Sequence, residues 1–316
     1  MKYDVYGLGN ALVDVQVTVD AAVVESTGNP PGSMVLIDHE TKDRIVGQLD
    51  SSRIMLNAGG SVANSMVGVV VLGGKTCFTG CVCDDEFGRS YGRSLAAAGV
   101  DFHAQYGELA TGTCIVLITP DAQRTFLTHL GCAVSITRAG VREEAIRDSR
   151  WLYVEGYLWD GPDAIDACRH AMAVAGKHGT RVAFTASDAF CVERHFRDYR
   201  EILERHANLF FANAAEAAAL TGVDEVPEAA RTMAGHCGLA AVTDGANGAF
   251  VATPERVVHV PAMPVTPVDT TGAGDAFAAG FLYGLTHELG LEGAARKGIA
   301  LAADVISRFG ARPVVG

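Results

Sequence analysis

The sequence predicts an α/β protein with a doubly wound, mainly parallel sheet that is flanked by helices and carries a small inserted β-sheet as a lid. Short apolar runs rich in branched and aromatic residues alternate with helical stretches along most of the chain, which is typical of a parallel sheet covered on both faces. Two further segments break this alternation with patterns typical of strands that have one polar face.

The core elements follow from the apolar runs and from the helical stretches between them. Strands are expected at residues 3–9, 75–82, 150–157, 181–186, 207–213 and 239–245. Helices are expected at residues 61–73, 87–99, 162–179, 214–222 and 273–290. Because strands and helices alternate, we expect the strands to run parallel.

The lid is expected from three strand-like segments. In residues 12–19 the four valines at odd positions share one face, while Leu12, Asp14, Gln16 and Thr18 share the other. Residues 111–130 are typical of two strands joined by a Pro-Asp turn, and residues 33–38 of a further strand. The valine face is expected to pack on the lid, on the core or on a second subunit. We therefore assign residues 1–11, 44–104 and 132–316 to the core, and residues 12–43 and 105–131 to the lid.

The composition is that of an acidic folded protein. The 316 residues carry a net charge of −12, which argues against binding to nucleic acid or to an anionic membrane. The sequence shows neither a signal-peptide pattern nor an apolar run long enough to span a bilayer, so we expect a cytoplasmic protein. The eight cysteines lack zinc or thioredoxin spacing, and we expect reduced core thiols and no structural metal. Monomer and homodimer both remain open.

Two glycine-rich motifs do not fit their usual nucleotide-binding interpretations. "GLGNAL" has Leu12 where a dinucleotide fingerprint needs its third glycine, and a strand rather than a helix follows it. "GVVVLGGKT", residues 68–76, places its first glycine one residue too early for a P-loop. A dehydrogenase is therefore disfavoured.

The segment "DTTGAGDAFAAG", residues 269–280, places a carboxylate directly behind three small residues at the start of an apolar helix. Gly272, Ala273 and Gly274 leave the helix amides open to a phosphoryl group, and Asp275 could then accept a proton from an attacking hydroxyl. The alternative is that Asp275 only stabilises a helix start. The residues alone give these two interpretations similar weight.

Three other segments have a structural interpretation, and for the first two a functional interpretation has equal standing. "NAGGSVANS", residues 57–65, suits close approach of a polyhydroxy ligand or a tight turn. "NAAE" is either a capping box or part of a magnesium and nucleotide site, with Asn213 and Glu216 in either role. "VTDGANG", residues 242–248, is a strand with a glycine-rich turn, commonly a hairpin.

Taken together, these motifs resemble those of the ribokinase-like family of carbohydrate and nucleoside kinases, in particular its adenosine-kinase-like branch. Six motifs occur in that family's order: "GNALVDV", "GGSVAN", "DDEFGRSYGRSLAAAGVD", "TGTCIVLITPDAQRT", "ANAAEAAALTG" and "DTTGAGDAFAAGFLYGL". The resemblance implies an α/β core with a β lid, and a kinase that uses Mg-ATP.

The resemblance also implies a role for each matching residue. Asp275 resembles the general base, and Gly272, Ala273 and Gly274 resemble the anion hole. Asp14 resembles the carboxylate that binds two neighbouring sugar hydroxyls, assisted by Asn10, Gly60, Ser61 and Asn64. Leu12, Leu36, Cys114, Leu158 and Phe190 match the walls of an apolar purine slot. The nucleotide side comprises Arg124, Asn213, Glu216, Thr243 and Gly245, with Glu216 binding Mg²⁺ through water. Asp269 and the C-terminal "SRFGARP", residues 307–313, match a site for a monovalent cation such as K⁺, and the alternative is that Asp269 only caps a turn.

The resemblance favours transfer of the γ-phosphoryl group of ATP to the 5′-hydroxyl of adenosine. Two departures bear on this: Asp244 stands where relatives more often have a basic or neutral residue, and "FTASDAF", residues 184–190, differs from the commoner Ser-Leu-Ser-Asp-Pro-Phe pattern. A sugar kinase of the same fold, for ribose or fructose, is the alternative. A non-catalytic nucleotide or nucleoside sensor is a more distant alternative.

Overall fold

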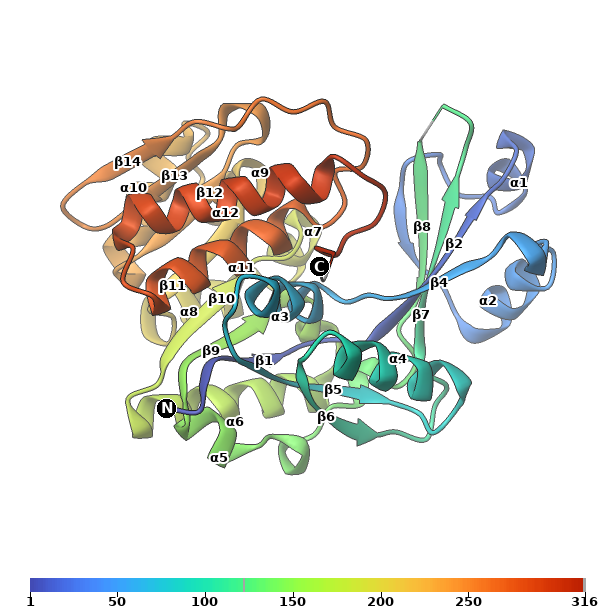
Figure 1. The fold of residues 1–316 in the computed structure, drawn as a ribbon, viewed down its shortest axis with the longest axis horizontal. Helices are drawn as coiled ribbons and strands as arrows, with labels where there is room; N and C mark the ends of the chain where they lie inside the picture. The colour runs from blue at the N-terminus through green and yellow to red at the C-terminus, as the bar shows by residue number, and fades with distance from the viewer. Residues whose placement is uncertain (122, 315–316) are drawn as a thin grey trace.

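Fourteen strands of the computed structural model form two sheets, and the structure describes residues 1–121 and 123–314 (Figure 1). The larger sheet has nine strands in the order β14-β13-β12-β11-β10-β9-β1-β5-β6. Seven of them are parallel, namely β1 Tyr3–Leu8, β5 Thr76–Val82, β6 Asp101–Tyr106, β9 Ser149–Glu155, β10 Arg181–Thr185, β11 Leu209–Asn213 and β12 Ala240–Thr243. The last two, β13 Ala249–Ala252 and β14 Val257–Val260, are antiparallel. The predicted doubly wound, mainly parallel core is confirmed.

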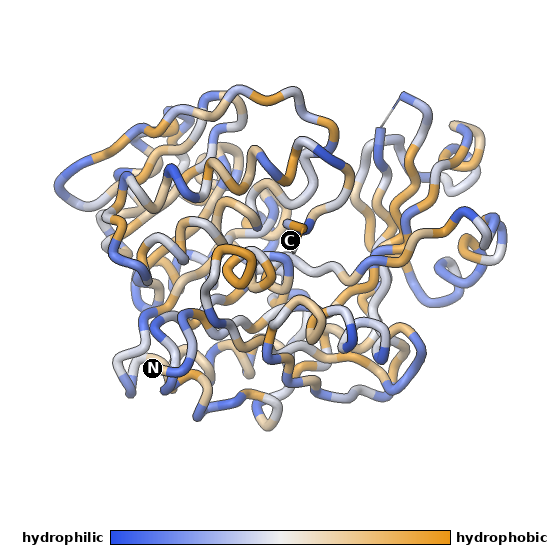
Figure 2. The backbone as a smooth tube through the Cα atoms, in the orientation of Figure 1, coloured by the Kyte–Doolittle hydropathy of each residue, from blue (hydrophilic) through white to orange (hydrophobic). Residues whose placement is uncertain are grey.

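Helices cover both faces of this sheet because its strands are apolar on both sides. One core cluster joins the strands to helices that include α5 Glu143–Arg147, α6 Pro162–His178, α7 Ala189–Arg194, α8 Phe196–Arg205, α9 Ala214–Thr221 and α10 Val226–Cys237. The opposite cluster contains α3 Ser61–Val71, α4 Glu86–Ala97, α11 Ala273–Thr286 and α12 Gly290–Ile306. Figure 2 shows hydrophobic residues concentrated along α3 and the central strands, with hydrophilic residues in the outer loops.

The smaller sheet is the predicted lid, and it stands to one side of the core (Figure 1). Its strand order is β3-β8-β7-β2-β4, with β2 Leu12–Thr18, β3 Met34–Leu36, β4 Met55–Ala58, β7 Gly112–Ile118 and β8 Arg124–His129. The alternating segment forms β2, and the predicted hairpin forms the antiparallel pair β7 and β8. Short helices α1 Ala21–Ser26 and α2 His39–Val46 belong to the same part of the chain.

The outer half of the valine face packs on the lid's own helices, whereas Val13, near the start of β2, belongs to the core cluster that contains α3 and α4. Val17 and Val19 form a cluster with Val24 of α1 and Ile45 of α2. These contacts bury Val17 and Val19 within the lid, so these two valines need no second subunit to cover them.

One strand departs from the domain boundaries expected from the sequence. Residues 44–104 were assigned to the core, yet β4 lies in this range and pairs with β2 in the lid sheet. Met55 and Leu56 of β4 are exposed, because β4 is an edge strand of that sheet. The segment thus contributes to the lid before the chain returns to the core at α3. Among the described residues, none of the helices is long and apolar enough to cross a membrane.

Candidate active site

A cleft of about 800 Å³ lies between the lid and the core. The carboxyl ends of parallel strands meet at one edge of a sheet, where ligands of open α/β folds bind. The lining residues come from β2, β3, β7 and β8 of the lid, and from the loops and helix starts that follow the core strands. Seventeen of the predicted site residues line the cleft: Asn10, Leu12, Asp14, Leu36, Gly60, Ser61, Asn64, Cys114, Arg124, Phe190, Asn213, Glu216, Thr243, Gly272, Ala273, Gly274 and Asp275.

Asp275 lies in the first turn of α11 and is bound by two side chains of α3. Ser61 Oγ donates to Asp275 Oδ1 at 2.6 Å, and Asn64 Nδ2 donates to Asp275 Oδ2 at 2.9 Å. Burial raises the pKa of Asp275, while these two donors and the Arg312 guanidinium lower it in part. The carboxylate is therefore held in a fixed orientation and is a stronger base than an exposed aspartate.

The start of α11 presents open backbone amides beside Asp275. Gly272 is the N-cap residue with a φ of 78°, and a Cβ on Gly274 would meet no atom within 4 Å. Within the described residues, the Gly272 and Gly274 amides donate to no protein acceptor. Ala273 differs from the expectation of three free amides, because its N–H donates to the Thr270 carbonyl at 3.2 Å. Two unpaired amides and the helix dipole make this end suited to an anion.

Polar groups of the lid and the first strand face the same cleft. Asp14 has its pKa raised to about 7 by burial, an effect that Arg312 opposes. Asn10 is buried, and its Oδ1 has no hydrogen-bond partner among the described residues. A buried acceptor without a partner is costly, and a ligand hydroxyl would satisfy it. Gly60 allows the start of α3 to pack closely against Asn10, because a Cβ at position 60 would lie 2.2 Å from the Asn10 carbonyl oxygen.

The apolar walls form as expected, with one exception. Leu12, Leu36, Cys114 and Phe190 line the cleft, and Phe190 is 69% exposed at its rim. Leu158 does not line it, because its side chain is fully buried in the core cluster beneath. The preceding residue contributes instead: Tyr157 lines the cleft.

Asn213 and Glu216 form the capping box that the spacing allowed. Glu216 Oε2 accepts from the Asn213 amide at 2.9 Å, and Asn213 Oδ1 accepts from the Glu216 amide at 2.9 Å. Burial raises the pKa of Glu216 to about 7. Both residues also line the cleft, so the structural interaction and a ligand-binding role are compatible.

The predicted turn beside the nucleotide follows β12. Thr243 lines the cleft, whereas Gly245 begins a short 3₁₀ helix, Gly245–Asn247, and does not line it. Asp244 accepts a hydrogen bond from Asn247 Nδ2 at 2.9 Å, so its carboxylate is engaged within the turn.

Arg124 of the lid contacts the core through Asp269. Arg124 Nη1 lies 2.8 Å from Asp269 Oδ2, and both side chains are buried. Asp269 also accepts from the Thr271 amide at 3.0 Å and from the Gly310 amide at 2.8 Å. With a guanidinium and two amides already on its oxygens, Asp269 does not fit as a K⁺ ligand in this arrangement. Arg124 lines the cleft, and its buried Nη2 has no hydrogen-bond partner among the described residues.

Besides Tyr157, the site contains further residues that were not singled out from the sequence, among them Glu155, Ser187 and Arg312. Glu155 is fully buried and accepts from the Asn10 amide at 2.7 Å and from the Val62 amide at 2.9 Å. Ser187 has a φ of 72° at the cleft, and its Oγ accepts from the Gly156 amide at 2.9 Å. The end of an apolar parallel strand could have pointed to Glu155. Arg312, near the C-terminus, has no local sequence signal.

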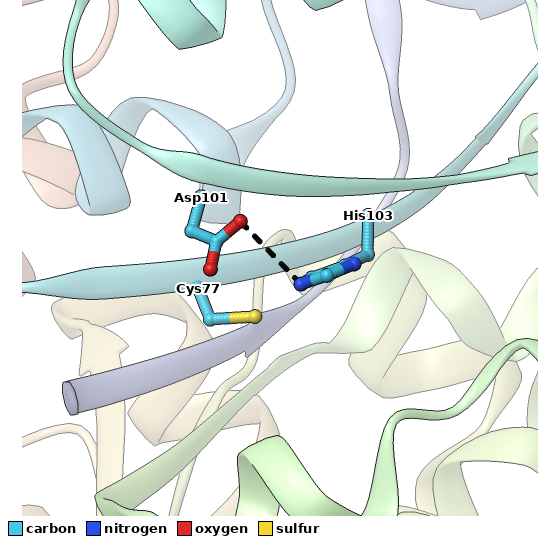
Figure 3. Close-up of side chains that lie close together, drawn as sticks. All are labelled: Cys77, Asp101 and His103. Carbon is cyan, nitrogen blue, oxygen red and sulfur yellow. Dashed lines mark ion pairs between the residues drawn. The ribbon is translucent and has the colours of Figure 1, made fainter. Parts of the chain in front are cut away.

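A separate group of ligand-type side chains, Cys77, Asp101 and His103, lies on β5 and β6 (Figure 3). Its candidate ligand atoms lie within 4.8 Å of one another, and His103 Nε2 is 3.4 Å from Asp101 Oδ1. However, Lys2 Nζ lies 3.6 Å from Asp101 Oδ2, and burial raises the pKa of Cys77 to about 12. A neighbouring ammonium and a protonated thiol both oppose binding of a cation. All eight cysteines are free thiols, and all except the half-buried Cys83 are buried.

The chain matches the model of the pfkB family carbohydrate kinases over residues 32–315. The crystal structure of adenosine kinase from Sinorhizobium meliloti superposes with a TM-score of 0.92 at 36% identity, covering 99% of this chain and 97% of that one. Adenosine kinase 1 of Arabidopsis thaliana is 27% identical over 96% of this chain and 94% of its own length. A fructokinase of Klebsiella pneumoniae is 31% identical over 74% of this chain and 78% of its own length.

Proposed function

The chain belongs to the pfkB family of carbohydrate kinases, and we propose that within this family it phosphorylates the 5′-hydroxyl of a nucleoside, adenosine, with ATP. The family makes the chain a phosphotransferase. The family model does not specify the acceptor, and adenosine is therefore the proposed part. The observation that carries the chemistry is the position of Asp275, bound by Ser61 and Asn64 directly beside the free amides of Gly272 and Gly274.

In the proposed reaction Asp275 accepts the proton of the acceptor hydroxyl as its oxygen attacks the γ-phosphorus of ATP. The new P–O bond forms while the bond to the β-phosphate oxygen breaks, so that ADP leaves with that electron pair. Negative charge on the transferred group meets the Gly272 and Gly274 amides and the positive end of the α11 dipole. Arg124 Nη2 adds a cationic donor from the lid. Most of the rate enhancement then comes from positioning and charge stabilisation.

Glu216 fits a contact with Mg²⁺ through water. Its oxygens already accept from Asn213, yet each keeps a lone pair for a water molecule, and Mg²⁺ usually retains several waters. The ion would supply charge neutralisation at the phosphates of ATP.

Two properties of the cleft support a nucleoside as acceptor. Its volume of about 800 Å³ leaves room for a ligand of nucleoside size. Its lid wall also carries the apolar residues Leu12, Leu36, Val116 and Phe126, which suit the face of a purine. Asp14 and the unpaired Asn10 Oδ1 supply acceptors for ribose hydroxyls. The adenosine kinases among the relatives agree with this assignment.

A sugar kinase is the second candidate, favoured by the identity of 31% to a fructokinase. An acceptor panel separates the two: purified protein with ATP and Mg²⁺ is assayed for ADP release with adenosine, ribose, fructose and sugar phosphates. We expect the highest kcat/KM with adenosine. Efficient use of a free sugar without use of adenosine would overturn the nucleoside assignment. Nucleoside binding without ADP release from any acceptor would instead indicate a sensor.

A further inference from the structure

The C-terminal segment that carries Arg312 returns to the centre of the molecule beside α3 (Figure 1). Gly310 donates its amide to Asp269 at 2.8 Å. The neighbouring Ala311 carbonyl oxygen lies only 2.3 Å from where a Cβ on Gly272 would be. The segment is therefore packed against the loop that precedes α11, and its position is fixed relative to the anion end of the cleft.

Arg312 extends from this segment to the residues that surround Asp275. Its Nε donates to Asn64 Oδ1 at 2.9 Å, and its Nη2 lies 3.4 Å from the Gly59 carbonyl oxygen. Its Nη1 lies 3.4 Å from Ser94 Oγ of α4. The contact with Asn64 has a direct consequence, because an amide whose oxygen accepts from Arg312 must present its Nδ2 to Asp275.

Arg312 also supplies positive charge in a region crowded with acids. Asp275 faces Asp14 from β2 and Glu155 from β9, and the charge of Asp275 raises the pKa of both. The other groups around it are Ser61 and Asn64 from α3, together with Tyr153 and Tyr157, whose pKa values it also raises. The Arg312 guanidinium opposes this crowding, because it lowers the pKa of Asp14 and of Asp275.

We propose that Arg312 is a positioning residue of the active site, which orients the Asn64 carboxamide towards Asp275 and keeps that carboxylate ionised. The inference rests on the proposed role of Asp275 as the base. It assigns a function to the C-terminal segment that carries Arg312.

Three variants test the proposal. Arg312→Ala removes both the charge and the hydrogen bond to Asn64, whereas Arg312→Lys keeps the charge but not the planar fork of donors. Arg308→Ala is the matched control, because it removes a guanidinium from the same segment where Arg308 pairs with Asp304 away from the cleft. Thermal unfolding of each variant shows whether the fold persists.

The first readout is the pH profile of kcat/KM. We expect the acidic limb to move to higher pH in Arg312→Ala. On that limb, kcat/KM should fall by about tenfold for each pH unit of displacement. Arg312→Lys should restore the position of the limb while kcat stays below that of the wild type. A folded Arg312→Ala variant with an unchanged limb and an unchanged kcat/KM would overturn the proposal. A wild-type kcat in Arg312→Lys would also overturn it, and so would a displacement of the limb in Arg308→Ala equal to that in Arg312→Ala.

The second readout does not depend on activity. Carbon NMR of protein labelled at the aspartate carboxyls follows the Asp275 resonance, identified by its loss in Asp275→Asn. We expect its titration midpoint to rise in Arg312→Ala and to stay near the wild-type value in Arg308→Ala. An unchanged midpoint in Arg312→Ala would contradict the inference even if the protein phosphorylated none of the tested acceptors. A raised midpoint in an inactive protein would leave Arg312 assigned and would reject the kinase proposal alone.

Discussion

Asn64 Nδ2 donates to Asp275 Oδ2 at 2.9 Å, and this contact joins the first turns of α3 and α11 on the core side of the cleft. The two residues are separated by 211 positions in the chain, yet both belong to helix starts that meet at the same edge of the sheet. The convergence of two helix starts is what brings a carboxylate, its donors and free amides together in one place.

Replacing Asp275 by Asn should abolish proton acceptance with little effect on folding. Asn has nearly the same size but no basic oxygen at neutral pH, so kcat should fall by roughly 10²- to 10⁴-fold. Steady-state kinetics with the best acceptor measure the loss, and thermal unfolding checks the fold. Turnover equal to that of the wild type would remove Asp275 from the mechanism.

Replacing Glu155 by Gln should change how stability depends on pH. Glu155 is fully buried, and burial raises its pKa from 4.5 to about 7. In the pH range between these values the folded chain binds a proton that the unfolded chain has released, so this group's contribution to stability decreases as pH rises. This pKa shift corresponds to a decrease of about 3 kcal/mol in the free energy of unfolding between pH 4.5 and pH 7.

Chemical denaturation of the wild type and of Glu155→Gln from pH 4.5 to pH 8 tests this prediction. The variant should be less stable at the acidic end, because its NH2 group cannot accept from a backbone N–H, whereas the hydroxyl oxygen of a protonated carboxyl still can. The difference in unfolding free energy between the variant and the wild type should then shrink as pH rises, because the wild type loses stability. A constant difference in unfolding free energy across the range would contradict the raised pKa.

Replacing Arg124 by Ala should destabilise the protein and weaken its use of ATP. The substitution leaves Asp269 as a buried carboxylate without its cation, which typically costs about 3–5 kcal/mol. The double variant Arg124→Ala/Asp269→Ala should recover part of this loss, since no unpaired charge remains. The double-mutant cycle measured by denaturation gives the coupling energy, and Arg44→Ala on α2 serves as the lid control. A coupling energy near zero would show that the pair does not join lid and core.

The periodicity of the sequence predicted the elements better than it predicted the contacts between them. Strand β2 was evident because its valines alternate with polar residues, and the hairpin because a Pro-Asp turn divides it. Strands β4, β6 and β14 and helix α12 were among the elements that were missed. In β4, three of the four residues, Met55, Leu56 and Asn57, are exposed and show no alternation.

In the site, too, local patterns predicted some residues, whereas the contacts between distant segments could not be predicted. Asp275 stood out because small residues and a carboxylate at a helix start have a local chemical meaning. No local pattern could place Arg312 beside Asn64, which lies 248 residues earlier in the chain. Leu158 and Tyr157 are neighbours in sequence, and only the packing of the 3₁₀ turn Gly156–Asp160 decides which of them enters the core.

Two glycines at the start of α11 should respond differently to the same substitution. A Cβ at Gly274 meets no atom within 4 Å, so Gly274→Ala should fold with an unchanged melting temperature. The added methyl group would still stand in the open space where the transferred phosphoryl group is proposed to contact the amides, and kcat should fall by roughly tenfold or more.

Gly272→Ala is the matched comparison. Gly272 has a φ of 78°, and its Cβ would lie 2.3 Å from the Ala311 carbonyl oxygen, so the variant must displace the C-terminal segment. We expect a lowered melting temperature together with lost activity, because backbone strain and a backbone clash act together. Melting curves and kcat of both variants separate the effects. Full activity in a stable Gly274→Ala protein would mean that the reacting phosphoryl group does not approach the amides at this end of α11.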